Sequence, residues 1–226
     1  MALPATHIRF AAVIAKRLAV TDMGAYLSGT LYPDSRWVTG IDRQQTHGRR
    51  CLDPGFACDD FTTGWHIHCL CDCIQGDVHS GLLGGLSEMT PDARWIRMSA
   101  AKTVQDMNDA VQEDLEARLS LLTHRRTPNG ESGDAVDAYL GFVRRAYRRP
   151  GKLDWSDYAR LWRDVGLDRQ RISQIAHQVQ RLFADDILVP RLQGAFERMV
   201  ARWDSRFNVR HYQLKHIAEG DMHHDS

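Results

Sequence analysis

Apolar residues recur at the spacing of an α-helix along most of this chain. An apolar stripe over residues 5–19 repeats every three or four positions and carries His7. A longer stripe of the same period predicts one helix from Asp92 to Leu122. Further amphipathic stretches lie at residues 134–147, 155–164, 168–188 and 191–206. Because no convincing pair of strands accompanies these stretches, the sequence predicts an all-α fold.

Length and composition are those of one folded domain. The chain has 226 residues, 43% hydrophobic and 26% charged, which excludes disordered and collagen-like classes. We assign residues 1–208 to a single multi-helix domain and residues 209–226 to a C-terminal tail. Arg9, Lys16 and Arg17 interrupt the N-terminal apolar stretch, so we expect no secretion signal, no membrane partner and a cytoplasmic location. A formal net charge of zero calls for no nucleic-acid partner.

A long loop is predicted after the second helix. Thr21 or Asp22 caps a short second helix that ends at Leu27. The segment 28–59 begins with a Ser-Gly pair and contains a Pro-Gly pair near its end. We therefore expect an irregular segment here, and it carries several of the candidate ligands.

The third predicted helix spans residues 61–74 and is capped by Asp59 or Asp60. Glycines follow it at positions 76, 81, 84 and 85 and predict a turn-rich connection.

Within this third helix, His68 and Asp72 lie four residues apart and therefore project from one face, where two side chains can bind one ion. Gly64 lies one turn earlier. A mid-helix glycine costs about 1 kcal/mol relative to alanine, so Gly64 indicates that a metal or a packed ligand approaches the backbone closely. His66 lies about 200° around the helix from His68 and is excluded from this cluster.

Two more candidate ligands, Asp34 and His47, belong to the predicted loop. Pro33 fixes the backbone just before Asp34 and presents its carboxylate from a stiffened segment. Carboxylates and imidazoles together form a nitrogen- and oxygen-rich shell. Such a shell suits zinc, with manganese and iron as alternatives, better than calcium.

The order of these residues resembles the zinc-dependent phospholipase C family, which is similar to single-strand-specific fungal nucleases. The resemblance covers about residues 5–75 and rests on His7, Asp34, His47, His68-x-x-x-Asp72 and the glycine and proline residues near them. It implies an all-helical fold that cleaves phosphoester bonds at a multi-zinc site. By this resemblance Asp34, His47, His68 and Asp72 hold one metal, and His7 with a bridging Asp72 contributes to a second.

The resemblance weakens after residue 75. Secreted members add a further histidine and a His-x-x-x-Glu pair, whereas this chain has His79 and then Lys102-x-x-x-Asp106. We therefore expect one or two metal ions rather than three.

These residues predict a metal-dependent hydrolase of a small phosphorylated substrate, either a phosphomonoester or a phosphodiester. A bound divalent ion lowers the pKa of its water towards about 7 and neutralises charge on a phosphoryl oxygen. Asp34 is the candidate catalytic residue, since it would both hold the metal and orient or deprotonate that water. Arg36 and Arg43 flank the ligands and are expected to bind phosphate oxygens.

Two other functions fit the same sequence. In the first, a metal or a buried His–Asp network only stabilises a non-catalytic helical module. In the second, an arginine-rich segment around Tyr147, residues 144–149, binds nucleic acid. We favour a solvated helix end for that segment, because arginine is favourable near a helix C-terminus.

Several other features have simple structural interpretations. The five cysteines are crowded between Cys51 and Cys73, which favours reduced thiols. Of Cys69, Cys71 and Cys73 only the first and last share a helical face, so we expect these three to be buried as small apolar residues rather than to bind zinc. We interpret Lys102 and Asp106 as an exposed ion pair away from the apolar stripe. The tryptophans at positions 155, 162 and 203 are expected in the core.

Overall fold

The computed structural model describes residues 3–111, 114–149 and 152–206, and within these ranges all regular structure is helical and no strand is present. The predicted all-α fold is therefore confirmed. The predicted tail, residues 209–226, lies outside the described residues. No described helix is both long and apolar enough to cross a membrane.

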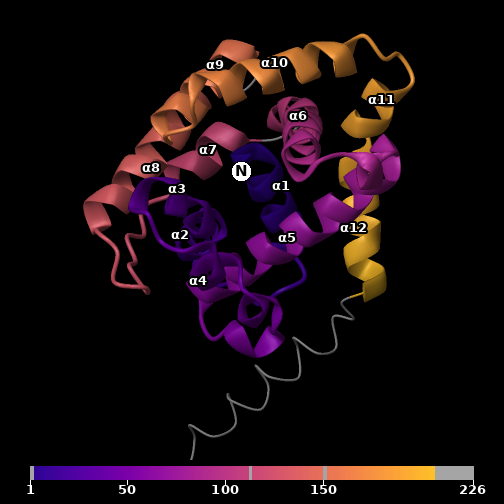
Figure 1. The fold of residues 1–226 in the computed structure, drawn as a ribbon. Helices are drawn as coiled ribbons and strands as arrows, with labels where there is room; N and C mark the ends of the chain where they lie inside the picture. Colours follow the sequence, from indigo (N-terminus) through magenta and orange to yellow (C-terminus); the bar gives the residue numbers. More distant parts are fainter. Residues whose placement is uncertain (1–2, 112–113, 150–151, 207–226) are drawn as a thin grey trace, which may run out of the picture.

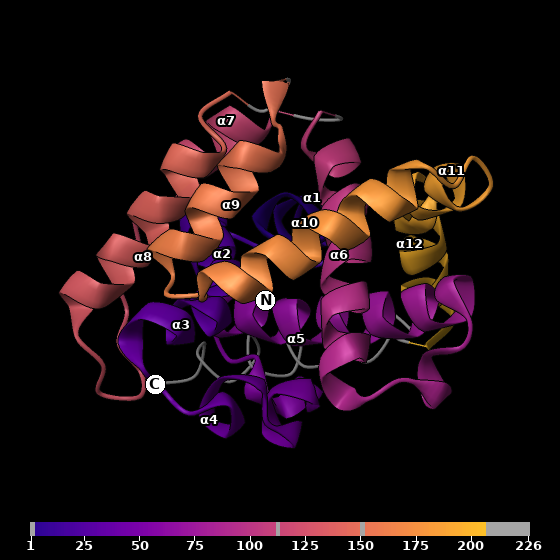
Figure 2. The same ribbon diagram turned by 45° about the horizontal axis from the view of Figure 1, so that its top comes forward.

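Helix α1 (Pro4–Ala15) lies at the centre of the helical assembly in both views (Figures 1 and 2). It packs against α2 (Met23–Leu31), α5 (Asp60–Leu83) and α6 (Pro91–Ala110). Nearly all of its side chains are buried, including those outside the predicted apolar stripe. A helix that is enclosed on all sides needs no polar face, which explains its mainly small and apolar sequence.

Helices α2 and α5 pack closely because each has a glycine at their contact. A Cβ atom on Gly64 would overlap the carbonyl oxygen of Tyr26, and one on Gly29 would overlap the carbonyl oxygen of Phe61. The close approach that we predicted at Gly64 therefore exists. Its partner is the backbone of α2, not a metal or a packed ligand.

The predicted loop over residues 28–59 is wrong in most of its length. Helix α2, whose N-cap is Asp22, continues to Leu31. A series of short helices then follows: η1 (Tyr32–Ser35), α3 (Arg36–Thr39), α4 (Arg43–His47), η2 (Arg49–Leu52) and η3 (Pro54–Phe56). None of these short helices is long enough to repeat an apolar residue over two turns, so periodicity could not reveal them.

Helix α5 is longer than predicted, because it continues through Gly76 and Gly81. Val78 and Leu82 lie in the core, and their tertiary packing maintains the helix despite the glycines. The helix begins as expected with a capping box at Asp59. The chain leaves it at Gly84 and Gly85, which both have positive φ angles of about 60°.

The single helix predicted from Asp92 to Leu122 is two helices. Helix α6 ends at Ala110, and α7 spans Leu115–Ser120. Val111, which the stripe placed in the core, is 53% exposed. The remaining helices are α8 (Gly133–Ala146), α9 (Trp155–Asp164), α10 (Arg169–Phe183), α11 (Leu188–Gln193) and α12 (Ala195–Arg206). Helix α10 crosses α6 on the outside of the molecule (Figure 2).

The cysteine and tryptophan predictions are largely confirmed. All five cysteines are free, and Cys69 is buried whereas Cys73 is exposed, contrary to expectation. Trp162 and Trp203 are buried, and Trp155 packs against the core while partly exposed.

Candidate metal centre

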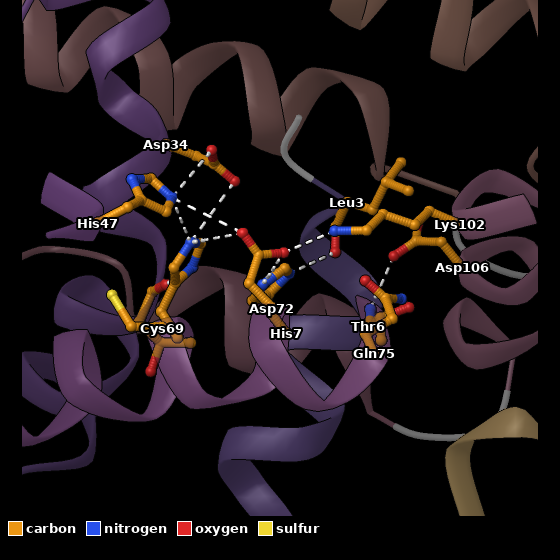
Figure 3. A network of polar contacts seen from close by, with 12 residues as sticks. Leu3, Thr6, His7, Asp34, His47, Cys69, Asp72, Gln75, Lys102 and Asp106 are labelled. Atoms are coloured by element: carbon orange, nitrogen blue, oxygen red, sulfur yellow. Dashed lines mark hydrogen bonds and ion pairs between the residues drawn. The ribbon is translucent and has the colours of Figure 1, made fainter. Parts of the chain in front are cut away.

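The five predicted ligands lie together, although they come from four separate elements (Figure 3). Asp34 belongs to η1, His47 ends α4, His7 lies in α1, and His68 and Asp72 share one face of α5. His7, Asp34 and His68 are buried, and the side chain of Asp72 is only 18% exposed. The structure therefore brings all five side chains to one place.

The ring of His68 is oriented by the close packing of α2 on α5. Its Nδ1 atom lies 2.8 Å from the carbonyl oxygen of Thr30. A carbonyl only accepts, so Nδ1 carries the hydrogen and donates it to Thr30. The Nε2 atom of a neutral His68 then presents a lone pair, which is the form that binds a metal.

The ring of His47 is oriented by its neighbour Thr46, whose hydroxyl oxygen lies 2.8 Å from Nδ1 of His47. That hydroxyl can donate to the carbonyl oxygen of Arg43, 3.4 Å away, and so accept from His47. The backbone of Thr46 is itself anchored, because Trp65 donates its indole N–H to the Thr46 carbonyl oxygen over 2.7 Å. His47 therefore also presents its Nε2 lone pair to the cluster.

The spacing of the two imidazole nitrogens suits one metal ion, and carboxylate oxygens lie slightly farther away. The Nε2 atoms of His47 and His68 lie 3.1 Å apart. Two nitrogens bound to zinc at 2.0–2.1 Å lie about 2.9–3.4 Å apart when the angle between them is 90–110°. Oxygens of Asp34 lie 3.9 Å from Nε2 of His47 and 3.8 Å from Nε2 of His68, and Oδ2 of Asp72 lies 3.8 Å from His47.

The electrostatics of this group also suit a cation. Burial lowers the pKa of His47 to about 4 and lowers that of His68 well below its ordinary value, so both rings are neutral near pH 7. Burial acts to raise the pKa of Asp72, but the Lys102 ammonium lowers it well below the usual range. Neutral imidazoles beside an ionised carboxylate are the protonation states that metal binding requires.

A second group of possible ligand atoms overlaps the first and consists of His7, His68 and Asp72. Nδ1 of His7 lies 3.1 Å from the carbonyl oxygen of Leu3, whereas its buried Nε2 atom has no hydrogen-bond partner. That Nε2 atom faces Oδ1 of Asp72 at 3.6 Å. Burial disfavours the protonated ring, but Cys71 and Asp72 outweigh burial and raise the pKa of His7 well above its ordinary value. His7 is therefore a poorer ligand than His47 or His68.

The interpretation of Lys102 and Asp106 as an exposed pair is wrong. Nζ of Lys102 lies 2.6 Å from Oδ1 of Asp72, at the candidate metal centre (Figure 3). Asp106 is fully buried and accepts hydrogen bonds from the backbone N–H of Thr6 and from the hydroxyls of Tyr147 and Tyr158. Other helices cover both faces of α6. The prediction assumed that α6 buries only its apolar stripe, and this assumption is wrong.

A cavity of about 410 Å³ opens beside the ligands and mixes cations with apolar side chains. Its lining includes His47, Asp72, Lys102, Arg43, Arg94, Leu52, Trp95 and Met98. Arg43 therefore lies where a substrate could bind, whereas Arg36 stacks on Trp37 and does not line this cavity. Arg94 was missed, although Arg94 and Lys102 lie eight residues apart and so share a face of α6.

Two other histidines lie outside the cluster. Nδ1 of His66 lies 2.7 Å from the carbonyl oxygen of Cys51, on another side of α5, as the helical geometry predicted. His79 is buried with its Nε2 atom 2.7 Å from Oε1 of Gln105. His79 therefore does not supply the additional histidine of the secreted phospholipases.

Two of the four arginines in the arginine-rich segment contact groups of the protein, whereas Arg148 and Arg149 are exposed. Tyr147 is buried, and Arg144 donates to the carbonyl oxygens of Leu119 and Leu122. Arg145 pairs with Asp164. The burial of Tyr147 therefore removes the aromatic side chain that this segment would offer to nucleic acid.

Comparison of this chain with family models, curated proteins and solved structures finds no match. The resemblance to zinc-dependent phospholipases C thus stays a prediction, and the functional argument rests on the geometry of the site.

Proposed function

We propose that this protein is a metal-dependent hydrolase of small phosphoesters. The observation that carries the proposal is the convergence of the His47 and His68 Nε2 atoms, 3.1 Å apart, beside two carboxylates. The Nδ1 atom of each ring has a hydrogen-bond acceptor, which holds the ring in the orientation and tautomer that a metal needs. Such a shell fits zinc, and also manganese or iron.

The residues have separate roles in this proposal. Asp34, His47, His68 and Asp72 hold the ion, which when bound supplies an activated water and neutralises phosphoryl charge. The two oxygens of Asp34 face different imidazoles, at 3.9 and 3.8 Å. Asp34 would hold the ion through one oxygen, and the other oxygen would be left to accept a proton from a water, which is the catalytic role we assign to Asp34.

The adjoining cavity supports a small anionic substrate with an apolar part. Arg43 and Arg94 have no carboxylate partner among the described residues, so their guanidinium groups are available to phosphate oxygens. Leu52, Trp95 and Met98 form the apolar side of the cavity. A volume of about 410 Å³ lies in the usual range for small-molecule sites.

Metal content and hydrolysis test this proposal together. We would measure bound metals by elemental mass spectrometry on tag-free protein. We would then assay p-nitrophenyl phosphate and bis-p-nitrophenyl phosphate with zinc, manganese or iron added. His68→Gln should lose both the metal and the activity, whereas His66→Gln, a buried histidine two positions away, should keep both. Wild-type hydrolysis that persists without metal would disprove the mechanism.

A non-catalytic module is the second candidate, because the 3.1 Å contact between His47 and His68 can also be a hydrogen bond. In that case a His47 Nε2–H would donate to His68, and Thr46 would donate to His47. A wild-type protein that retains no metal after reconstitution would favour this second function.

A further inference from the structure

We propose that the ammonium group of Lys102 takes the place of a second metal ion, so that the centre holds one metal and one fixed cation. This inference rests on the proposed function, since it concerns the same site. It follows from the two overlapping groups of ligand atoms, Asp34–His47–His68 and His7–His68–Asp72. Among the described residues, the second group has a lysine ammonium paired with one of its ligand atoms.

The second group is already occupied by positive charge. Nζ of Lys102 lies 2.6 Å from Oδ1 of Asp72, the oxygen that faces His7 at 3.6 Å. An ion bound to that oxygen at about 2.1 Å would lie less than about 5 Å from the ammonium. No described carboxylate other than Asp72 lies in this second group to compensate two cations so close together.

Asp72 then bridges the two cations through its two oxygens. Oδ2 faces Nε2 of His47 at 3.8 Å and Nε2 of His68 at 4.0 Å, whereas Oδ1 is paired with Lys102. A carboxylate that bridges two metals uses its oxygens in the same way. The arrangement therefore keeps the bridging geometry but replaces one metal with an ammonium group.

The charges of the described residues are consistent with one ion. Apart from His7, whose raised pKa adds further positive charge, Asp34 and Asp72 contribute two negative charges, and Lys102 with one divalent ion contributes three positive charges. The small excess of positive charge suits a phosphate ligand. A second divalent ion would raise the excess to three charges inside a mostly buried site.

Lys102 is also placed to contact the substrate. Its side chain lines the cavity together with Arg43 and Arg94. In this position the ammonium can donate a hydrogen bond to a phosphate oxygen while it remains paired with Asp72. A second metal would bind that oxygen directly, so Lys102 supplies the same charge without a further ligand set.

The number of bound metals distinguishes the alternatives. We would titrate metal-free protein with zinc by calorimetry and count retained equivalents by elemental mass spectrometry. Wild type should bind one equivalent tightly. Lys102→His removes the ammonium and adds an imidazole beside His7 and Asp72, so it should bind two. Lys102→Arg keeps the positive charge and should still bind one.

Lys102→Gln provides a second test in case Lys102→His does not fold, and circular dichroism checks the folding of both variants. Lys102→Gln should bind a second equivalent of zinc more weakly than the first. Two tight equivalents in the wild type would overturn the role of Lys102 while leaving the metal centre intact. A single equivalent in the folded Lys102→His and Lys102→Gln variants would overturn it as well. Absence of any bound metal in the wild type would instead overturn the proposed function, and this inference with it.

Discussion

Two consecutive residues of α1, Thr6 and His7, belong to two buried polar clusters. These clusters differ in how completely their polar atoms are hydrogen-bonded. Thr6 joins a cluster around Asp106, in which the carboxylate accepts from one backbone N–H and two tyrosine hydroxyls at 2.6–2.8 Å. His7 joins the candidate metal centre, where the Nε2 atoms of His47 and His68 converge at 3.1 Å. Nε2 of His7 has no hydrogen bond there and faces Oδ1 of Asp72 at 3.6 Å. Saturated hydrogen bonds indicate a structural role, and converging lone pairs indicate a site for a ligand.

The largest expected effect is a loss of activity when the candidate metal centre, and not the structural cluster, is altered. Asp72→Ala removes the carboxylate that we propose as a metal ligand, so it should abolish metal retention and lower the proposed phosphoesterase activity by more than about 100-fold. Its helix content, measured by circular dichroism, should stay close to that of the wild type. Asp77→Ala, an exposed carboxylate on the same helix, is the control and should change neither quantity. Loss of all structure in Asp72→Ala would instead assign this cluster a structural role.

A substitution in the structural cluster around Asp106 should lower the stability of the protein without affecting metal binding. Asp106→Ala leaves the backbone N–H of Thr6 and the hydroxyls of Tyr147 and Tyr158 without their acceptor in a buried place. We expect the free energy of unfolding to fall by about 3–5 kcal/mol in chemical denaturation. The fraction that remains folded should still retain its metal. A loss below about 1 kcal/mol would mean that water satisfies these groups, and the contrast between the clusters would be lost.

His47 of the candidate metal centre and Asp109 beside the structural cluster should respond to pH in opposite directions. Burial lowers the pKa of His47 from 6.5 to about 4, so the unfolded state binds a proton more readily than the folded state. The stability of the metal-free protein that depends on neutral His47 is present above pH 6.5. It is lost as the pH falls towards 4, by up to about 3 kcal/mol.

Asp109, which is next to the structural cluster, has its pKa raised from 3.8 to about 6 by burial. Its contribution is therefore present below pH 3.8 and is lost as the pH rises through 6. Urea unfolding of metal-free protein between pH 4 and 7 tests both groups. His47→Gln should reduce the loss at acid pH, and Asp109→Asn should reduce the loss that occurs as the pH rises from about 4 to 6. An unchanged pH profile in both variants would contradict these assignments.

The sequence predicted a feature correctly where the contact that produces this feature joins residues close together in the chain. The pair His68 and Asp72 follows from helical spacing, and the caps at Asp22 and Asp59 follow from residue type. The fold class follows from periodicity, because most helices are long enough to repeat an apolar residue. The short helices after α2 are too short to do so.

Long-range contacts account for what could not be predicted. Lys102 pairs with Asp72, thirty residues away, and Asp106 receives hydrogen bonds from Thr6, Tyr147 and Tyr158. Neither contact has a spacing rule, since both depend on how α6 packs. The convergence of Asp34 and His47 on α5 was expected only from the order of residues in a resembling family.

The smallest expected effect tests how helix packing supports the metal centre. Gly64→Ala places a Cβ against the carbonyl oxygen of Tyr26 and pushes α2 away from α5, which should cost about 1–3 kcal/mol. It should also weaken metal binding, because the carbonyl of Thr30 on α2 orients His68. Gly76→Ala on the same helix is the matched control, since its Cβ meets no atom within 4 Å. That control should stabilise the protein by about 0.5–1 kcal/mol with unchanged metal affinity. Thermal denaturation and zinc titration of both variants measure these effects. If Gly64→Ala lowers stability but binds zinc as tightly as Gly76→Ala does, the orientation of His68 does not depend on the packing of α2.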